Sequence, residues 1–180
     1  MRIEKSDSTA LVIDIQERLF PHMVEKESLL QRTLLLLEGL KILQVPVQMT
    51  EQYPRGLGPT LEPVAKALPS LSPIEKMTFS CCDEPSYLLE LERSGKKSVI
   101  ICGIEAHVCV LQTVTDLISA GFLPVVVADC ISSRRADDKE VALERMRSEG
   151  AVITTSESIL FELTRAAENE TFKTISKLVK

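Results

Sequence analysis

The stretch Ala10-Leu11-Val12-Ile13-Asp14 indicates the fold class, because four consecutive apolar residues end at a carboxylate. Two later stretches follow the same pattern: Val99-Ile100-Ile101-Cys102 ends at Gly103, and Val125-Val126-Val127-Ala128 ends at Asp129. Continuous rather than alternating hydrophobicity is typical of strands buried on both faces, as in a parallel sheet covered by helices. The three runs therefore predict an α/β protein.

Helical patterns occupy the segments between these runs, as parallel strands require. We expect helices over residues 23–43, 85–93, 107–120, 137–149 and 156–166, and further strands over 45–50, 74–77 and 151–154. The alternation predicts a doubly wound, mostly parallel six-stranded sheet with helices on both faces, in a Rossmann-like arrangement.

Length and composition favour one domain. The chain has 180 residues, and at ~150 residues per domain we expect a single unit over 1–180. A C-terminal helix over about 168–180 would place Phe172, Ile175, Leu178 and Val179 on one face and dock on the body or on a neighbouring subunit. The leucine-rich helix over 23–43 has an apolar surface wider than one core-facing stripe, which predicts a homo-oligomer.

The net charge is -5, from 21 basic and 26 acidic residues, and the sequence has no basic footprint for nucleic acid or a membrane surface. No apolar run approaches the ~20 residues that span a bilayer, so we expect a cytoplasmic protein. The five cysteines form no Cys-x-x-Cys pair and have no histidine at zinc-ligand spacing. We therefore expect no disulfide framework, no metal and no cofactor, with a small molecule as substrate.

Residues 53–73 form the least regular stretch, with five of the nine prolines plus Gly56 and Gly58. We interpret it as a long surface connection. Two alternatives stay open for it: a substrate lid, or a crossover with a short helix that begins near Pro59 or Pro63.

Three reactive residues fall at the predicted carboxyl ends of strands, where open parallel sheets bind ligands. Asp14 ends the first strand, Lys76 ends a middle strand, and Cys109 opens the helix after Gly103. The helix dipole and a nearby ammonium would lower the pKa of the Cys109 thiol, and Asp14 would move protons. This combination suits covalent acyl transfer. Taken singly, each residue also has a plainer structural interpretation: a strand-end cap, a surface lysine and a buried thiol.

Three segments resemble the isochorismatase-like cysteine hydrolase superfamily, and they occur in the family's order: Ala10–Gln16, Glu75–Ser80 and Cys102–Val110. Three further segments resemble more narrowly the small isochorismatase-domain-containing proteins of largely unassigned substrate: Thr50–Pro54, Gly56–Gly58 and Asp129–Arg134.

The resemblance implies an isochorismatase-like hydrolase fold and a catalytic triad of Cys109, Asp14 and Lys76. It also implies a cis peptide between Ile104 and Glu105. In the family this turn aims the backbone N–H groups that match Glu105 and Cys109 at the substrate oxygen, as an oxyanion hole. The implied activity is hydrolysis of a small amide or related carbonyl compound through a thioester. His107 stays outside this scheme, because positions i and i+2 of a helix do not face each other.

Departures from the family's subgroups narrow the reaction. Nicotinamidases of this superfamily carry an Asp-x-His metal motif with further histidines, whereas this chain has Thr50-Glu51-Gln52-Tyr53-Pro54 at that place and two histidines in all. Isochorismatase proper lacks the cysteine nucleophile that Cys109 would supply. Gln16, Gln52, Tyr53 and Phe79 are candidates to line the substrate pocket, although Phe79 is equally suited to the core.

Two alternatives from other functional classes remain. A reactive Cys109 would also suit a thiol-based redox sensor. A catalytically silent binding or scaffold subunit would keep the fold and the oligomer interface without turnover. Nucleotide binding is less well supported, because the chain has no Gly-x-Gly-x-x-Gly after a strand and no P-loop.

Overall fold

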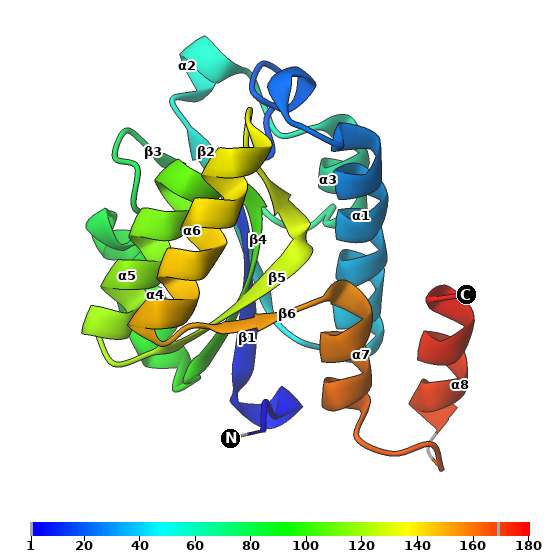
Figure 1. Cartoon of the computed structure of the whole chain (residues 1–180). Coiled ribbons are helices and arrows are strands. Elements are labelled where there is room, and N and C mark those ends of the chain that lie inside the picture. Colours follow the sequence, from blue (N-terminus) through cyan, green and yellow to red (C-terminus); the bar gives the residue numbers. More distant parts are fainter. Residues whose placement is uncertain (1, 169) are drawn as a thin grey trace.

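The computed structural model describes residues 2–168 and 170–180, and within them a six-stranded, wholly parallel sheet has the order β3-β2-β1-β4-β5-β6 (Figure 1). Residue 1 of the expected 1–180 unit and residue 169 of the expected C-terminal helix lie outside the described residues. The strands are β1 (Ser8–Ile13), β2 (Val47–Gln52), β3 (Ile74–Lys76), β4 (Ser98–Ile104), β5 (Leu123–Ser132) and β6 (Val152–Thr154). This order confirms the doubly wound α/β prediction.

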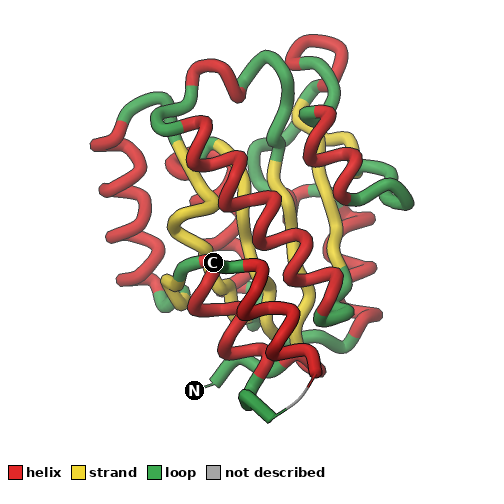
Figure 2. Tube along the Cα trace, turned by 90° about the vertical axis from the view of Figure 1, so that its right-hand side faces the viewer, coloured by secondary structure: helices red, strands yellow, loops and turns green. Residues whose placement is uncertain are grey.

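Helices cover both faces of the sheet (Figures 1 and 2). One face packs against α1 (Lys26–Ile42), α3 (Glu62–Ala67), α7 (Ser156–Thr164) and α8 (Glu170–Leu178). The other packs against α4 (Pro85–Ser94), α5 (Leu111–Ser119) and α6 (Ala136–Glu149). Successive residues of β1 point to opposite faces, so Val12 enters the first core and Leu11 and Ile13 enter the second. The unbroken apolar run is therefore buried throughout.

Strands β2 and β5 have boundaries that differ from the prediction, and the helix expected over 23–43 begins at Lys26. Strand β2 begins and ends two residues later than expected, which places Gln52 in the sheet. Strand β5 does not end at Asp129, because its register against β4 shifts between Ile101 and Gly103 and pairing then resumes as far as Ser132. Asp129 has a structural role here: its carboxylate accepts hydrogen bonds from the Ser156 N–H (2.7 Å) and hydroxyl (2.6 Å) at the start of α7.

The connection over residues 53–73 is a crossover with short helices. A one-turn helix, α2 (Pro54–Leu57), follows β2, and α3 then has Pro63 in its first turn. Val64 of α3 is completely buried in the core. The structure therefore shows the crossover alternative for this segment.

The C-terminal helix docks on its own chain. In Figure 2, α8 lies alongside α1 and α7. The ring centroids of Phe172 and Phe161 are 6.0 Å apart, and Ile175 is completely buried. Of the two alternatives for this helix, the structure shows docking on the body.

Gly103 allows β4 to lie close to β1 at the end of the two strands. Its φ is +135°, and a Cβ at this position would overlap the Ile13 carbonyl oxygen. We expect Gly103→Ala to lower the free energy of unfolding by about 3 kcal/mol, because backbone strain and overlap add. Gly95→Ala is the matched control, since φ there is +67° with open space around the position. That control should cost only about 1 kcal/mol. Urea denaturation measures both, and equal losses would show that the close approach is not limiting.

Candidate active site

The three reactive residues lie at one edge of the sheet, beside the point where its strand order reverses. Asp14 follows β1, Lys76 ends β3, and Cys109 lies in a short π-helix (Ala106–Val110) after β4. Open α/β sheets bind ligands at such a point, because the connections on either side of it leave in opposite directions. The sequence therefore predicted correctly which edge of the sheet carries these groups.

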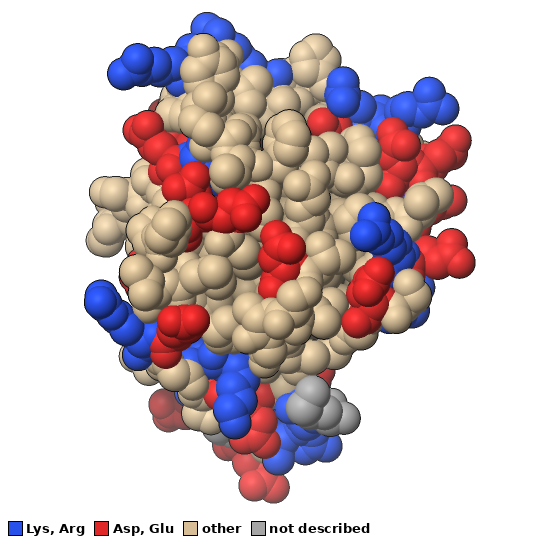
Figure 3. Space-filling view, turned by 90° about the vertical axis from the view of Figure 1, so that its left-hand side faces the viewer, with Lys and Arg blue, Asp and Glu red and all other residues tan. Residues whose placement is uncertain are grey.

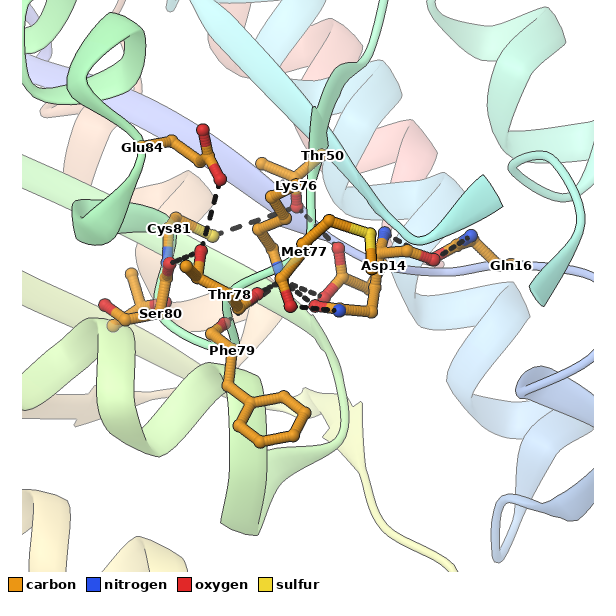
Figure 4. Close-up of polar contacts among 12 residues, drawn as sticks. Asp14, Gln16, Thr50, Lys76, Met77, Thr78, Phe79, Ser80, Cys81 and Glu84 are labelled. Carbon is orange, nitrogen blue, oxygen red and sulfur yellow. Dashed lines mark hydrogen bonds and ion pairs between the residues drawn. The ribbon is translucent and has the colours of Figure 1, made fainter. Parts of the chain in front are cut away.

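Asp14 and Lys76 form a completely buried ion pair. The Lys76 Nζ donates to Asp14 Oδ2 at 2.6 Å, and both side chains have zero exposure. Nζ also lies 2.9 Å from Gln52 Oε1, 3.0 Å from the Phe79 carbonyl oxygen and 3.2 Å from that of Thr78 (Figure 4). Burial by itself lowers the pKa of Lys76, but the charge of Asp14 and the neighbouring thiol groups outweigh it and raise the pKa above 10.5. Lys76 is therefore a cation at neutral pH.

Cys109 lies beside this ion pair and is a neutral thiol. Its residue is 6% exposed. Burial raises the pKa of the thiol, and Asp14 raises it further as a nearby negative charge and as a hydrogen-bond acceptor, while Lys76 opposes the shift. The expectation that helix dipole and ammonium lower this pKa is therefore wrong. Desolvation and a carboxylate outweigh them, and the proton stays on sulfur at neutral pH.

The main chain before Cys109 has an irregular conformation. The peptide bond between Ile104 and Glu105 is cis. The Glu105 carbonyl accepts from Val108 N–H at 3.1 Å and Val110 N–H at 3.2 Å, on either side of Cys109. The bond from Val110 spans five residues, which is the π-helical pattern, and the turn that it closes contains Cys109.

The Glu105 side chain has a role that sequence reasoning missed. Its Oε2 accepts from the backbone N–H of Arg134 at 3.1 Å and from Nε of the same residue at 3.0 Å. The carboxylate thus ties the turn after β4 to the loop after β5. The sequence offers no specific signal for this contact, because Glu105 could be paired with many basic residues of the chain.

The Gln16 and Gln52 side chains make hydrogen bonds to main-chain groups around them, and Gln52 also binds Lys76. Gln16 Nε2 donates to the carbonyls of Gln52 (2.9 Å) and Gly58 (2.7 Å), and Oε1 accepts from the Gln52 N–H at 2.7 Å. Gln52 in turn donates from Nε2 to the Met77 carbonyl at 2.9 Å. Both residues are buried, and Gln52 Oε1 accepts from the Lys76 Nζ at 2.9 Å, so this amide helps to hold the ammonium. Direct contact of Gln16 and Gln52 with substrate stays a prediction.

Tyr53 and Phe79 are exposed side chains. They are 46% and 54% exposed, and Met77 is 68% exposed. In Figure 4 the Phe79 ring points away from the buried polar groups. Phe79 is thus not a core residue.

Thr50 is a site residue for which sequence reasoning assigned no role. Its hydroxyl donates to Asp14 Oδ1 at 2.8 Å, and the residue is 1% exposed. The available signal was its position, because Thr50, Glu51 and Gln52 are polar residues at the end of a buried strand on the same edge as Asp14.

Other features lie outside this cluster. A cavity of about 340 Å³ opens between β5, α1 and α6, and its lining includes Val24, Asp129 and Lys139 but none of the three reactive residues. In the described part of the chain, no group of three or more His, Cys, Asp or Glu side chains could hold a metal ion. No helix there has both the length and the apolar character needed to cross a bilayer.

Comparisons with known proteins agree with this geometry. Residues 8–158 match the family described as the isochorismatase domain. Isochorismatase domain-containing protein 2A of Mus musculus is 38% identical over 180 residues, which covers 99% of this chain and 85% of the mouse protein. Among solved structures, the MAR1 ribonuclease of Caenorhabditis elegans is 35% identical with a TM-score of 0.94, covering 99% of this chain and 92% of the nematode chain.

A bacterial structure shares the fold at lower identity. The YcaC gene product of Escherichia coli, described as an octameric hydrolase of unknown specificity, has a TM-score of 0.93 at 24% identity. The alignment covers 99% of this chain and 90% of the bacterial chain.

Proposed function

This chain belongs to the isochorismatase domain family, and from that membership and the buried cluster we propose that it is a cysteine-dependent hydrolase of a small amide or related carbonyl compound. The observation that carries the proposal is the side-chain hydrogen bond between the neutral Cys109 thiol and the Asp14 carboxylate, whose Oδ2 is bound by a buried ammonium. This arrangement gives Cys109 a base within reach and gives the base a fixed positive partner.

In the first half of the reaction, the Cys109 sulfur attacks the carbonyl carbon while its proton moves to Asp14. A C–S bond forms, and the carbonyl π electrons move to oxygen. The N–H groups of Glu105 and Cys109 are proposed to stabilise that oxyanion, at roughly 3 kcal/mol per donor. Lys76 remains protonated and holds Asp14 in place. The adduct then collapses to a thioester, and the leaving amine takes the proton from Asp14.

In the second half, Asp14 removes a proton from water as the water oxygen attacks the thioester carbonyl. The tetrahedral adduct expels Cys109 sulfur, which recovers its proton from Asp14, and the carboxylic acid product leaves. Asp14 therefore transfers one proton in each direction in each half of the reaction, and the net reaction consumes one water.

The proposed partners are a small-molecule substrate and further copies of this chain. Figure 3 shows the face covered by α4, α5 and α6, where acidic groups are scattered over a largely uncharged surface and no continuous basic patch forms. The net charge of -5 likewise does not favour RNA as substrate, although the nematode relative is named a ribonuclease. The octameric description of the bacterial relative supports self-association. Five free thiols suit a reducing compartment, and we propose the cytoplasm.

The test of the nucleophile needs no known substrate. Each cysteine is alkylated with iodoacetamide between pH 6 and 8, with peptide mass mapping, in the native protein and in Asp14→Asn. Proton transfer inside the Cys109–Asp14 pair consumes no hydroxide, so the native rate at Cys109 should be independent of pH. In Asp14→Asn the rate should rise about tenfold per pH unit, because only the free thiolate then reacts. A native protein with the same tenfold slope would refute assistance by Asp14.

Turnover is tested by ammonia or amine release from a panel of small amides. Cys109→Ala should abolish it, whereas Cys102→Ala should retain it, because Cys102 is a buried core thiol of β4. Reversible oxidation of Cys109 by peroxide without hydrolysis of any amide would favour the redox sensor. An unassisted thiol together with no hydrolysis would favour the binding or scaffold subunit.

A further inference from the structure

The partners of the Asp14 carboxylate come from strands on both sides of β1. In the order β3-β2-β1-β4, Thr50 on β2 and Lys76 on β3 lie on one side of Asp14, and the turn that carries Cys109 follows β4 on the other. Thr50 donates to Oδ1 at 2.8 Å and Lys76 to Oδ2 at 2.6 Å. Each oxygen thus has one fixed donor from the β2 and β3 side, and the remaining lone pairs are available to the thiol.

Thr50 is attached to Asp14 through main chain and side chain together. Ile13 pairs with Thr50 in the sheet, and the Asp14 N–H donates to the Thr50 carbonyl at 3.3 Å. The hydroxyl bond then closes a second link between the same two residues. The carboxylate therefore cannot turn about its own side-chain bond without breaking the Thr50 contact.

The direction of the Thr50 hydroxyl proton follows from its other neighbour. Cys81 Sγ donates to Thr50 Oγ1 at 3.8 Å, and Cys81 is itself held by a bond from its N–H to Thr113 Oγ1 at 2.9 Å (Figure 4). Because Oγ1 accepts from Cys81, its single proton is directed to Asp14. The row Cys81–Thr50–Asp14 is completely enclosed in the protein.

From this geometry we propose that Thr50 is a positioning residue, whose hydroxyl keeps the Asp14 carboxylate turned toward the Cys109 thiol. The inference rests on the proposed function, in which Asp14 is the base. The ionisable groups that face Asp14 are Lys76, Cys109 and Cys81, and Lys76 is the strongest attraction among them. Without the Thr50 hydroxyl, the carboxylate swings toward the Lys76 ammonium and away from the thiol. Thr50 itself touches no reacting atom.

The experiment measures iodoacetamide alkylation of Cys109 at pH 7 in variants of Thr50. We expect Thr50→Val to slow it about tenfold, since a hydrogen bond to a charged group contributes about that factor. Thr50→Ser, which keeps the hydroxyl, should restore the rate to within about twofold. Thr33→Val is the matched control, because Thr33 is a completely buried threonine of α1 outside the site, and it should leave the rate unchanged. Thr50→Ala replaces the valine variant if that variant does not fold.

The decisive arm repeats Thr50→Val in the Asp14→Asn background. A positioning residue has nothing to position there, so the second substitution should not change the rate. An equal tenfold loss in both backgrounds would overturn the inference in favour of a structural role. If the Thr50→Val single variant is alkylated at the same rate as the native protein, the inference is overturned as well. If native protein and Asp14→Asn show the same rate and pH slope, the proposed function fails and this inference fails with it, which separates the two cases.

Discussion

Lys76→Met is expected to lower the free energy of unfolding by about 3–5 kcal/mol, because it leaves the Asp14 charge buried without its cation. The ammonium has four oxygen acceptors within 3.2 Å, and all of them lose a donor. Methionine fills nearly the same volume, so the loss reports on charge and hydrogen bonding and not on a cavity. Urea denaturation at pH 7 measures the effect.

A double-mutant cycle separates the buried charge from the packing. Adding Asp14→Asn to Lys76→Met removes the stranded negative charge, so the double variant should be more stable than Lys76→Met alone. Lys66→Met is the control for a surface pair: Lys66 lies 2.7 Å from Glu62, but both side chains are more than 70% exposed, and the change should stay within about 0.5 kcal/mol. A double variant as unstable as Lys76→Met would show that the charge of Asp14 is not the cause.

The pair also explains why the placement of the site could be predicted from the sequence. Asp14 follows β1 and Lys76 is the last residue of β3, and the carboxyl ends of parallel strands meet at one edge by the geometry of the crossovers. Local pattern therefore determined which groups converge. The same reasoning placed Cys109 correctly, because its helix follows β4 directly.

Protonation and hydrogen bonding at the site could not be predicted in this way. The state of Cys109 depends on burial and on Asp14, a residue from another strand, and no local rule weighs those against the helix dipole. Gln16 and Gln52 are predicted pocket residues because they are polar and near the right edge. Their amides also bind main-chain groups that only the packing of β1, β2 and the Gly58 loop brings within reach.

Local backbone irregularities escaped prediction for a different reason. The segment Ala106–Val110 has side chains as suitable for an α-helix as for the π-helix that the structure shows. The register shift that lets β5 continue to Ser132 likewise depends on its neighbour β4. The π-helix contains Cys109 itself, so one of the least predictable parts of the fold carries the thiol.

Mild alkali is expected to destabilise the protein strongly, because all five thiols are held neutral in the folded state. Burial raises the pKa of Cys81 from about 9 to about 11 and that of Cys82 and Cys102 to about 12. The pKa values of Cys109 and Cys130 are raised as well, again by burial first. An unfolded chain ionises its thiols near pH 9, whereas the folded chain keeps those protons. Above that pH the folded state binds more protons, and the free energy of unfolding falls as pH rises.

The size of this effect follows from the number of protons. At pH 10 each thiol contributes a loss of about 1 kcal/mol, so the five together remove roughly 5 kcal/mol relative to pH 7, a large part of a domain's usual stability. Lys76 does not add to it, because the raised pKa of that ammonium moves its own loss of stability above pH 10.5. Urea denaturation between pH 7 and 10, in the presence of a reductant, gives the slope of the free energy of unfolding against pH, which counts the protons released on unfolding. In Cys102→Ala the slope should fall by one proton, although the variant is less stable at pH 7. A native slope below one proton would mean that these thiols ionise without unfolding, and the cluster around Asp14 would then be open to solvent.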